Sequence, residues 1–207
     1  MKHFYSELGE NWFTYPNLYK SIVQKFPNNS HFVEVGTWKG MSAAYMAVEI
    51  VNSGKNIKFD CVDTWEYLDS QNEIPKNAFE NLYDIFLKNI EPVKHVITPV
   101  RAISWEAAQK YADNSLDFVF IDAAHDYESV KKDINAWYPK IKKEGILAGH
   151  DYTWCIDVKK AVDECLASQI KTTDEGCWIY TTFGGGPEGT GAKDAGDPET
   201  TSDARIE

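Results

Sequence analysis

Short apolar runs alternate with segments of helical periodicity along most of the chain. The apolar runs have the length of strands and lie at 31–36, 57–62, 95–100, 116–122 and 146–149. The run LDFVFID at 116–122 is almost continuously apolar, which is typical of a strand buried on both faces. Strands that alternate with helices in this way predict an α/β fold around a mainly parallel sheet.

Helical patterns fill the intervals between these runs. We expect a lead-in helix at 16–26 and further helices at 39–52, 76–90, 104–111, 127–141 and 156–168. In the fifth of these segments an apolar stripe recurs at helical spacing, formed by Val130, Ile134, Trp137 and Ile141. After the last helix, 169–172 and 177–182 flank a turn and predict a hairpin, so the sheet should end in an antiparallel strand.

The composition changes near residue 184. Residues 184–207 carry six acidic and two basic side chains and only one apolar residue larger than alanine. Such a segment buries too little apolar surface to offset its ordering entropy, so we expect an acidic, glycine-rich, disordered tail. Residues 1–183 have the length of one domain, in which 1–30 form the N-terminal lead-in region.

The formal net charge of −11 makes nucleic acid or an anionic membrane an unexpected partner, because both favour basic surfaces. No apolar run approaches the roughly 20 residues that span a bilayer, and the N-terminus lacks the apolar segment of a signal peptide. The four cysteines form no C-x-x-C pair and are typical of reduced thiols. A cytoplasmic protein without membrane contact is therefore expected.

The stretch HFVEVGTWKGMSAA, which begins at His31, has the order strand, glycine turn, helix. A dinucleotide site needs G-x-G-x-x-G, but Trp38 stands where its second glycine would be. A ligand without phosphate fits better: Glu34 would attract an ammonium, and the helix N-terminus after Gly40 would receive a carboxylate. S-adenosylmethionine carries both groups. The turn, with Thr37 and Trp38, is a candidate cofactor site, although it could also merely connect strand to helix.

The second strand ends in an acidic residue, Asp63. A carboxylate in this position grips a ribose diol in dinucleotide folds, because it accepts hydrogen bonds from both hydroxyls. Trp65 follows closely and could flank an adenine. The competing interpretation of Asp63 is a solvated loop acid.

Residues 31–67, 96–122 and 145–151 together resemble a class I S-adenosylmethionine-dependent methyltransferase. The sharpest part, FIDAAHDYESVKKDINAWYPKIKKEGILAGHDY, resembles small-molecule O-methyltransferases related to macrolide-sugar and catechol methylating enzymes. The resemblance implies a Rossmann-like, doubly wound, seven-stranded sheet of order 3-2-1-4-5-7-6 with strand 7 antiparallel. It also implies a set of cofactor contacts: Glu34, Gly36, Gly40, Ser42, Asp63 and, against adenine, Ser104 and Trp105.

Acidic and histidine side chains follow the fourth and fifth strands. Neighbouring strands should bring Asp122 close to His150 and Asp151, beside the methyl group of the cofactor, and carboxylates suit Mg²⁺ or Mn²⁺. The resemblance matches Asp122 and Asp151 to metal ligands, whereas His150 stands where the catechol-type enzymes have an acid. His125 stands where they have a general-base lysine, and an imidazole suits that role near neutral pH. Alternatively, His125 and Asp126 only begin the next helix, with Asp126 as its N-cap.

These observations predict an S-adenosylmethionine-dependent O-methyltransferase for a small hydroxylated molecule or sugar, with assistance from a divalent metal. His125 and Asp122 are the candidate catalytic residues, and aromatic residues of the N-terminal region and of the 64–92 insertion would shape the acceptor pocket. Two alternatives are a cofactor-binding module without catalysis and an NAD-dependent oxidoreductase, the second disfavoured by Trp38. The sequence leaves open the acceptor, the metal and whether the protein forms a homo-oligomer.

Overall fold

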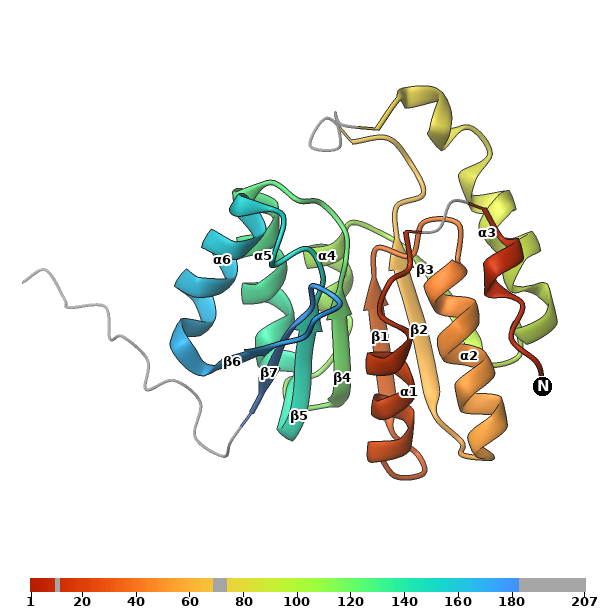
Figure 1. Cartoon of the computed structure of the whole chain (residues 1–207), viewed down its shortest axis with the longest axis horizontal. Helices are drawn as coiled ribbons and strands as arrows, with labels where there is room; N and C mark the ends of the chain where they lie inside the picture. The colour runs from red at the N-terminus through yellow and green to blue at the C-terminus, as the bar shows by residue number, and fades with distance from the viewer. Residues whose placement is uncertain (10–11, 69–73, 183–207) are drawn as a thin grey trace, which may run out of the picture.

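The computed structural model describes residues 1–9, 12–68 and 74–182 (Figure 1). The tail predicted at 184–207 lies outside the described residues. Within the described part of the chain, no helix is long and apolar enough to cross a membrane.

Seven strands form one sheet of order β3-β2-β1-β4-β5-β7-β6. The strands are β1 (His31–Val35), β2 (Lys58–Asp63), β3 (Ile97–Arg101), β4 (Leu116–Ile121), β5 (Ile141–Gly149), β6 (Ile170–Thr172) and β7 (Trp178–Thr181). The first five are parallel, and β7 pairs antiparallel with both β5 and β6. The predicted α/β class, the strand order and the antiparallel seventh strand are confirmed.

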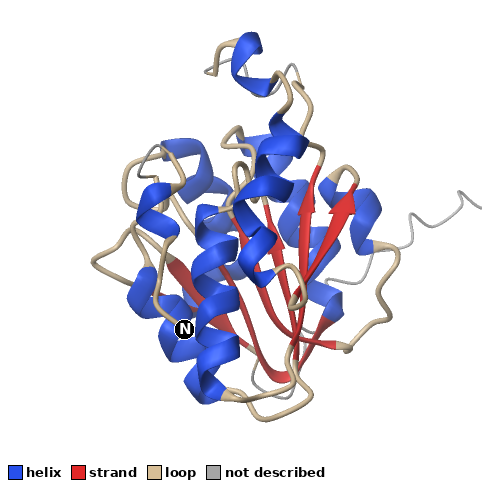
Figure 2. Cartoon of the chain, turned by 90° about the vertical axis from the view of Figure 1, so that its right-hand side faces the viewer, coloured by secondary structure: helices blue, strands red, loops and turns tan. Residues whose placement is uncertain are grey.

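Helices cover both faces of this sheet (Figures 1 and 2). They are α1 (Pro16–Lys25), α2 (Met41–Ser53), α3 (Leu82–Ile90), α4 (Ser104–Ala108), α5 (Tyr127–Trp137) and α6 (Ile156–Leu166). The first three pack against one face with Phe32, and the last three pack against the other with Val33. This division follows from the strands, because successive side chains of β1 point to opposite faces.

Two predicted helices differ from those observed. The segment predicted as a helix at 76–90 divides into a 3₁₀ turn, η3 (Lys76–Phe79), and α3, because Asn81 between them takes a left-handed backbone with φ 55°. The segment 127–141 ends its α-helix at Trp137 and continues as the 3₁₀ turn η5 (Tyr138–Lys140). Pro139 cannot donate an α-helical hydrogen bond, so the chain turns there and Ile141 begins β5 instead of ending the helical stripe.

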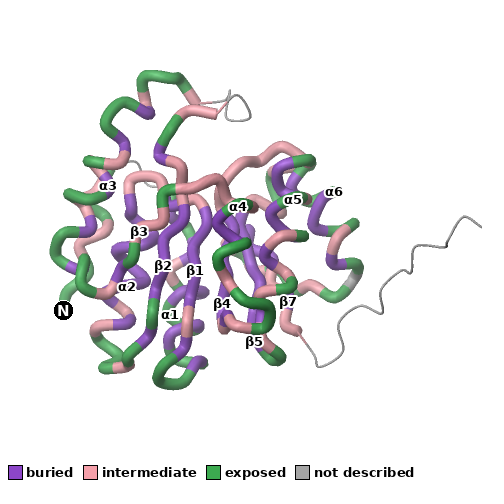
Figure 3. Tube along the Cα trace, turned by 180° about the vertical axis from the view of Figure 1, so that it is seen from behind, coloured by how far each residue is buried: buried purple, intermediate pink, exposed green. Residues whose placement is uncertain are grey.

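The centre of the sheet is buried on both sides, as Figure 3 shows for β1, β2, β4 and β5. Aromatic rings fill the layer under α1: Tyr15 and Tyr19 pack on Phe120, and Phe32 packs edge-on against Phe118. Aromatic pairs of this kind contribute beyond their buried area, so the layer holds the chain just before α1 firmly against β4.

The sheet hydrogen bonding continues one residue beyond three strands. Gly36 N donates to Val62 O at 2.8 Å and Asp122 N donates to Val35 O at 2.8 Å. His150 N donates to Ile121 O at 3.1 Å in the same way. The segments after β1, β4 and β5 therefore start at the same edge of the sheet, where open α/β sheets bind their ligands.

Candidate active site

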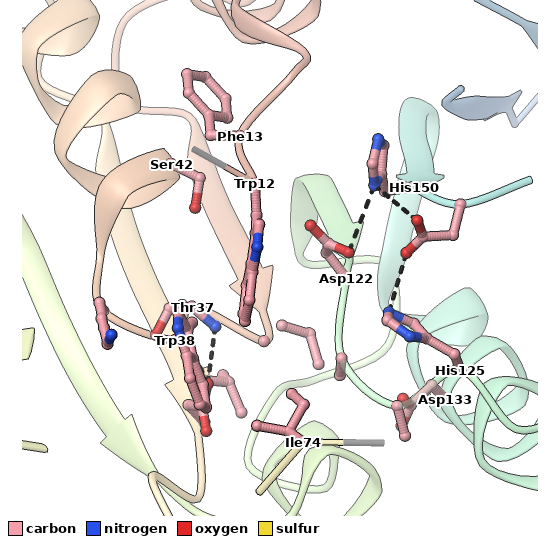
Figure 4. A pocket seen from close by; sticks show the side chains of 18 of the residues that line it. Trp12, Phe13, Thr37, Trp38, Ser42, Ile74, Asp122, His125, Asp133 and His150 are labelled. Carbon is pink, nitrogen blue, oxygen red and sulfur yellow. Dashed lines mark hydrogen bonds and ion pairs between the residues drawn. The ribbon is translucent and has the colours of Figure 1, made fainter. Parts of the chain in front are cut away.

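A cavity of about 450 Å³ opens at this edge of the sheet (Figure 4). Most of the residues predicted for the site line it: Gly36, Thr37, Trp38, Ser42, Asp63, Trp105, Asp122, His125, His150 and Asp151. Four others do not line the cavity, namely Glu34, Gly40, Trp65 and Ser104. The tertiary structure thus brings nearly the whole predicted set into one place.

Asp63 holds the first turn in shape. Its Oδ2 accepts hydrogen bonds from the backbone N–H groups of Thr37 at 2.9 Å and Trp38 at 3.0 Å, and its Oδ1 accepts from Trp65 N at 2.8 Å. Burial raises the pKa of Asp63, and these N–H donors oppose that rise. The carboxylate therefore fixes the turn directly, and its contact with a ribose stays a prediction.

Glu34 lies beneath the cavity floor and is fully buried. The hydroxyl of Ser42, which does line the cavity, donates a hydrogen bond to its carboxyl group. Burial raises the pKa of Glu34 to about 8, although the Ser42 hydrogen bond opposes the rise. Glu34 thus carries a proton near neutral pH in this state, and its attraction for an ammonium stays a prediction.

Gly40 and Trp65 support the turn from outside the cavity. Gly40 precedes α2 with φ 84°, a backbone that glycine adopts without strain. The ring of Trp65 is 2% exposed, packs on Tyr83 and Phe86, and donates from Nε1 to Trp38 O at 3.0 Å. The contact predicted between Trp65 and adenine is untested, and the ring braces Trp38 in this structure.

The ends of β4 and β5 bring two acids and two histidines together, as the dashed lines in Figure 4 show. Asp151 contacts both imidazoles: His125 Nε2 lies 3.0 Å from its Oδ2, and His150 Nδ1 lies 3.2 Å from its Oδ1. His150 Nδ1 is also 3.8 Å from Asp122 Oδ1. These distances define one linked acid and histidine cluster in the cavity wall.

Charges within this cluster shift its protonation. Burial alone would raise the pKa of Asp151, but hydrogen bonds from His125 and His150 hold that pKa well below its usual range. Burial would lower the pKa of His150, but Asp151 and Asp122 raise it above the usual value. Burial raises the pKa of Asp122. Asp151 is therefore ionised, and it provides the negative charge that both imidazoles contact.

Three of these side chains could share a cation. Asp122, His125 and Asp151 each offer one ligand atom, and the three atoms lie within 4.8 Å of one another. His150 is not part of this group: its Nδ1 contacts Asp151 and Asp122, and its Nε2 faces Thr14 Oγ1 at 3.0 Å and Glu175 O at 3.1 Å. The geometry thus favours His125 over the predicted His150 as the third ligand.

Some contacts at the site could not be predicted from the sequence. Tyr15 OH donates to Asp122 Oδ2 at 2.7 Å, and the two residues are 107 positions apart, so only the fold shows their contact. Trp154 donates from Nε1 to Asp151 Oδ1 at 2.6 Å and lines the cavity although it is 60% exposed. Asp133 lines the cavity from α5, where a lone acid in a helix looks like an ordinary surface residue.

Comparison with known proteins identifies the family. A family model described as a methyltransferase domain matches residues 33–152, more than half of the chain's 207 residues. The match includes the first turn, Asp63 and the acid and histidine cluster. The chain belongs to this methyltransferase family, and membership implies S-adenosylmethionine as the cofactor.

One relative is similar to this chain in sequence, and two solved structures share its fold. An uncharacterized protein of Acanthamoeba polyphaga mimivirus, R132, is 27% identical over 167 residues, which are 77% of this chain and 69% of that protein. The O-methyltransferase NovP superposes with a TM-score of 0.64 at 17% identity, covering 82% of this chain and 80% of NovP. CalS11, a TDP-rhamnose 3'-O-methyltransferase of calicheamicin biosynthesis, gives 0.56 at 14% identity, covering 87% and 81%.

Proposed function

We propose that this methyltransferase transfers the methyl group to a hydroxyl of a small molecule or sugar. The observation that carries the proposal is the pair of His125 and Asp151, 3.0 Å apart in the wall of the cavity. An imidazole held by a carboxylate is suited to accept the proton of a hydroxyl group. Methyl transfer to nitrogen or sulfur has less need of such a base.

The side chains of the cavity perform the remaining tasks. S-adenosylmethionine, when bound, supplies the methyl as a sulfonium; its C–S bond breaks as the O–C bond forms. The turn held by Asp63 positions the cofactor, and the acid and histidine cluster positions the acceptor hydroxyl. Both are needed because in-line displacement depends on close and collinear placement of the reacting atoms. His125 takes the hydroxyl proton, and Asp151 stabilises the resulting imidazolium.

A divalent cation would fit the same cluster. Asp122, His125 and Asp151 would hold it, and a bound cation would lower the pKa of a coordinated hydroxyl. A histidine among two carboxylates favours Mn²⁺ over Mg²⁺. In that arrangement His125 acts as a ligand and no longer as the base.

The rim of the cavity supports a ring-shaped acceptor. Trp12 and Trp154 line it while remaining 54% and 60% exposed, and Trp12 stacks on Trp38 with centroids 5.5 Å apart. Exposed aromatic faces suit sugar or aromatic rings. The likeness to NovP and to CalS11, which acts on a TDP-rhamnose, supports a sugar as the first acceptor to test.

The net charge supports a proposal about the acceptor, and the cysteines support a proposal about the location of the protein. A net charge of −11 disfavours nucleic acid as the acceptor. The four cysteines are free in the structure, as suits a cytoplasmic protein.

Turnover of a panel of hydroxylated sugars and phenols, with and without chelator, tests these proposals. We expect His125→Ala to abolish methyl transfer, while calorimetry still detects binding of S-adenosylhomocysteine to this variant. Glu80→Ala, an exposed change outside the cavity, is the control and should keep full activity. Loss of activity on chelation, restored by Mn²⁺, supports the cation; full activity after chelation rejects it and leaves His125 as the base. Full activity of the His125→Ala variant would refute the role of this cluster.

A further inference from the structure

Tyr15 lies directly before α1 and lines the cavity, but its ring belongs to the core. The residue is 1% exposed, and its ring packs on Phe120 and Tyr19 with centroids 4.6 Å and 5.1 Å apart. Pro16, the first residue of α1, restricts the backbone that follows. The tyrosine ring therefore has little freedom to move, and its hydroxyl is held at one place.

That hydroxyl holds one oxygen of Asp122. Tyr15 OH donates to Asp122 Oδ2 at 2.7 Å, since a carboxylate only accepts and the phenol has the proton to give. His150 Nδ1 is 3.8 Å from the other oxygen, Oδ1, which is beyond hydrogen-bond reach. Among the residues that the structure describes, Tyr15 is thus the hydrogen-bond donor that directs the Asp122 carboxyl group.

The backbone of Asp122 is fixed without help from Tyr15. Asp122 N donates to Val35 O at 2.8 Å, and a Cβ on Gly36 would come within 2.0 Å of Asp122 O. The freedom that remains lies in the side-chain torsions, the last of which has a broad energy minimum in aspartate. A hydrogen bond to one oxygen restricts that torsion, so Tyr15 determines where the negative charge of this side chain lies.

The position of this charge matters because of His125. Asp122, His125 and Asp151 each offer one polar atom, and these three atoms lie within 4.8 Å of one another. In the proposed reaction His125 becomes an imidazolium, which a nearby carboxylate stabilises by an attraction that weakens with distance. Groups that are already in place when charge develops stabilise it most, because they need no rearrangement during the reaction.

We propose that Tyr15 is a positioning residue for methyl transfer. Its hydroxyl holds the Asp122 carboxylate beside His125, so that the carboxylate stabilises the imidazolium formed when His125 takes the proton of the acceptor hydroxyl. Tyr15 acts through Asp122, from which it is separated by 107 positions in the chain. The inference rests on the proposed function and adds a residue from the N-terminal region to the cluster.

Tyr19 provides a matched control. It lies one turn further along α1, is fully buried, and packs on the same Phe120 ring with centroids 5.1 Å apart. Tyr15→Phe and Tyr19→Phe each remove one buried hydroxyl from the same aromatic layer. The hydrogen bond to Asp122 comes from Tyr15, so only Tyr15→Phe releases this carboxyl group.

Steady-state kinetics with S-adenosylmethionine and the sugar or phenol that the native protein methylates fastest tests the inference. Tyr15→Phe should lower kcat by about 10-fold or more, the effect of losing a hydrogen bond to a charged group in the transition state. The KM for the acceptor and the Kd for S-adenosylhomocysteine should stay within about 2-fold of the native values, because the ground state is unaffected. Tyr19→Phe should keep kcat within about 2-fold of the native value.

A second comparison tests whether Tyr15 acts through Asp122. Asp122→Asn removes the charge that Tyr15 positions, so adding Tyr15→Phe to this variant should change kcat by less than about 2-fold. If the two losses multiply instead, Tyr15 acts by another route and the inference is overturned. If Tyr15→Phe alone fails to fold, the comparison of Asp122→Asn with the double variant decides the question.

A kcat of Tyr15→Phe that matches that of Tyr19→Phe also overturns the inference, as does a loss that appears only in KM. Thermal unfolding of both single variants verifies that they are folded at the temperature of the assay. If the native protein methylates no acceptor of the panel, the proposed function fails as well. An active native protein with an equally active Tyr15→Phe variant overturns the inference alone, which separates the two proposals.

Discussion

Several buried carboxyl groups at this site accept hydrogen bonds from a backbone segment or contact neighbouring side chains. Asp63 accepts from three backbone N–H groups, Asp151 contacts two imidazoles, and Glu34 accepts from Ser42. Burying a carboxyl group without such partners is costly. Glu34 and Asp133 each keep one oxygen, Oε2 and Oδ1, without a hydrogen-bond partner among the described residues, and burial raises the pKa of both carboxyl groups and keeps Glu34 protonated.

This protonation predicts how stability depends on pH. The pKa of Glu34 in the folded protein is about 8, against an ordinary 4.5, so the folded state binds the extra proton between these values. The stabilisation is complete below about pH 4.5 and is lost as the pH rises through 8. Urea unfolding should therefore give a free energy of unfolding lower at pH 9 than at pH 6, by about twice the roughly 1.4 kcal/mol that one pKa unit represents.

Glu34→Gln removes the titration while keeping the shape of the side chain, so its stability should fall much less between pH 6 and pH 9. The exposed Glu80→Gln change is the control and should behave like the native protein. An equal fall in the Glu34→Gln variant would contradict the assignment of a raised pKa to this carboxyl group.

At the scale of elements, turns of positive φ determine how the segments after the strands reach the cavity. Gly36 has φ 83°, and a Cβ there would overlap the backbone of Asp122. Gly176, before β7, has φ 81° and lies directly against Trp154, where a Cβ would come within 2.5 Å of the ring. This close contact keeps the Trp154 ring in position to hydrogen-bond Asp151.

Gly176→Ala should displace Trp154 and so loosen Asp151. Gly54→Ala is a matched control, because Gly54 has φ 67° and open space around its Cβ position. Both variants should lose about 1–2 kcal/mol of unfolding free energy to the left-handed backbone. Only Gly176→Ala should also lose methyl transfer, measured as kcat at saturating cofactor. Equal kcat values in both variants would show that the position of the Trp154 ring does not affect methyl transfer.

At the scale of the whole molecule, the cavity lies at the edge of the sheet where the parallel strands end, and a cofactor that fills this cavity should stabilise the fold. A ligand at 100 times its Kd adds about 2.7 kcal/mol to the free energy of unfolding. For a protein of this size, that corresponds to a rise in Tm of roughly 5–10 °C. S-adenosylhomocysteine should produce this shift in a thermal scan, and NADH at the same concentration should not. A shift with NADH and none with S-adenosylhomocysteine would favour the NAD-dependent oxidoreductase, the alternative that Trp38 disfavours.

Much of the fold and the set of cavity residues follow from local patterns. The alternation of apolar runs and helical stripes predicted every strand, because a sheet covered on both faces must be built from such runs. Where local patterns erred, a single backbone feature decided: the left-handed Asn81 divided one helix, and Pro139 ended another. Neither position breaks the hydrophobic period, so the pattern alone concealed both.

The sequence by itself determined the fold class, the strand order through its resemblance to a known family, and the strand ends that carry Asp63, Asp122 and Asp151. Parallel strands bring these ends to one edge, so their residue types alone indicated the chemistry. Only the tertiary structure decided the contacts that run between distant segments: Tyr15 with Asp122, both histidines with Asp151, and Asp133 in the cavity wall. The physical reason is that side-chain direction and burial depend on packing across the sheet, which sequence periodicity does not encode.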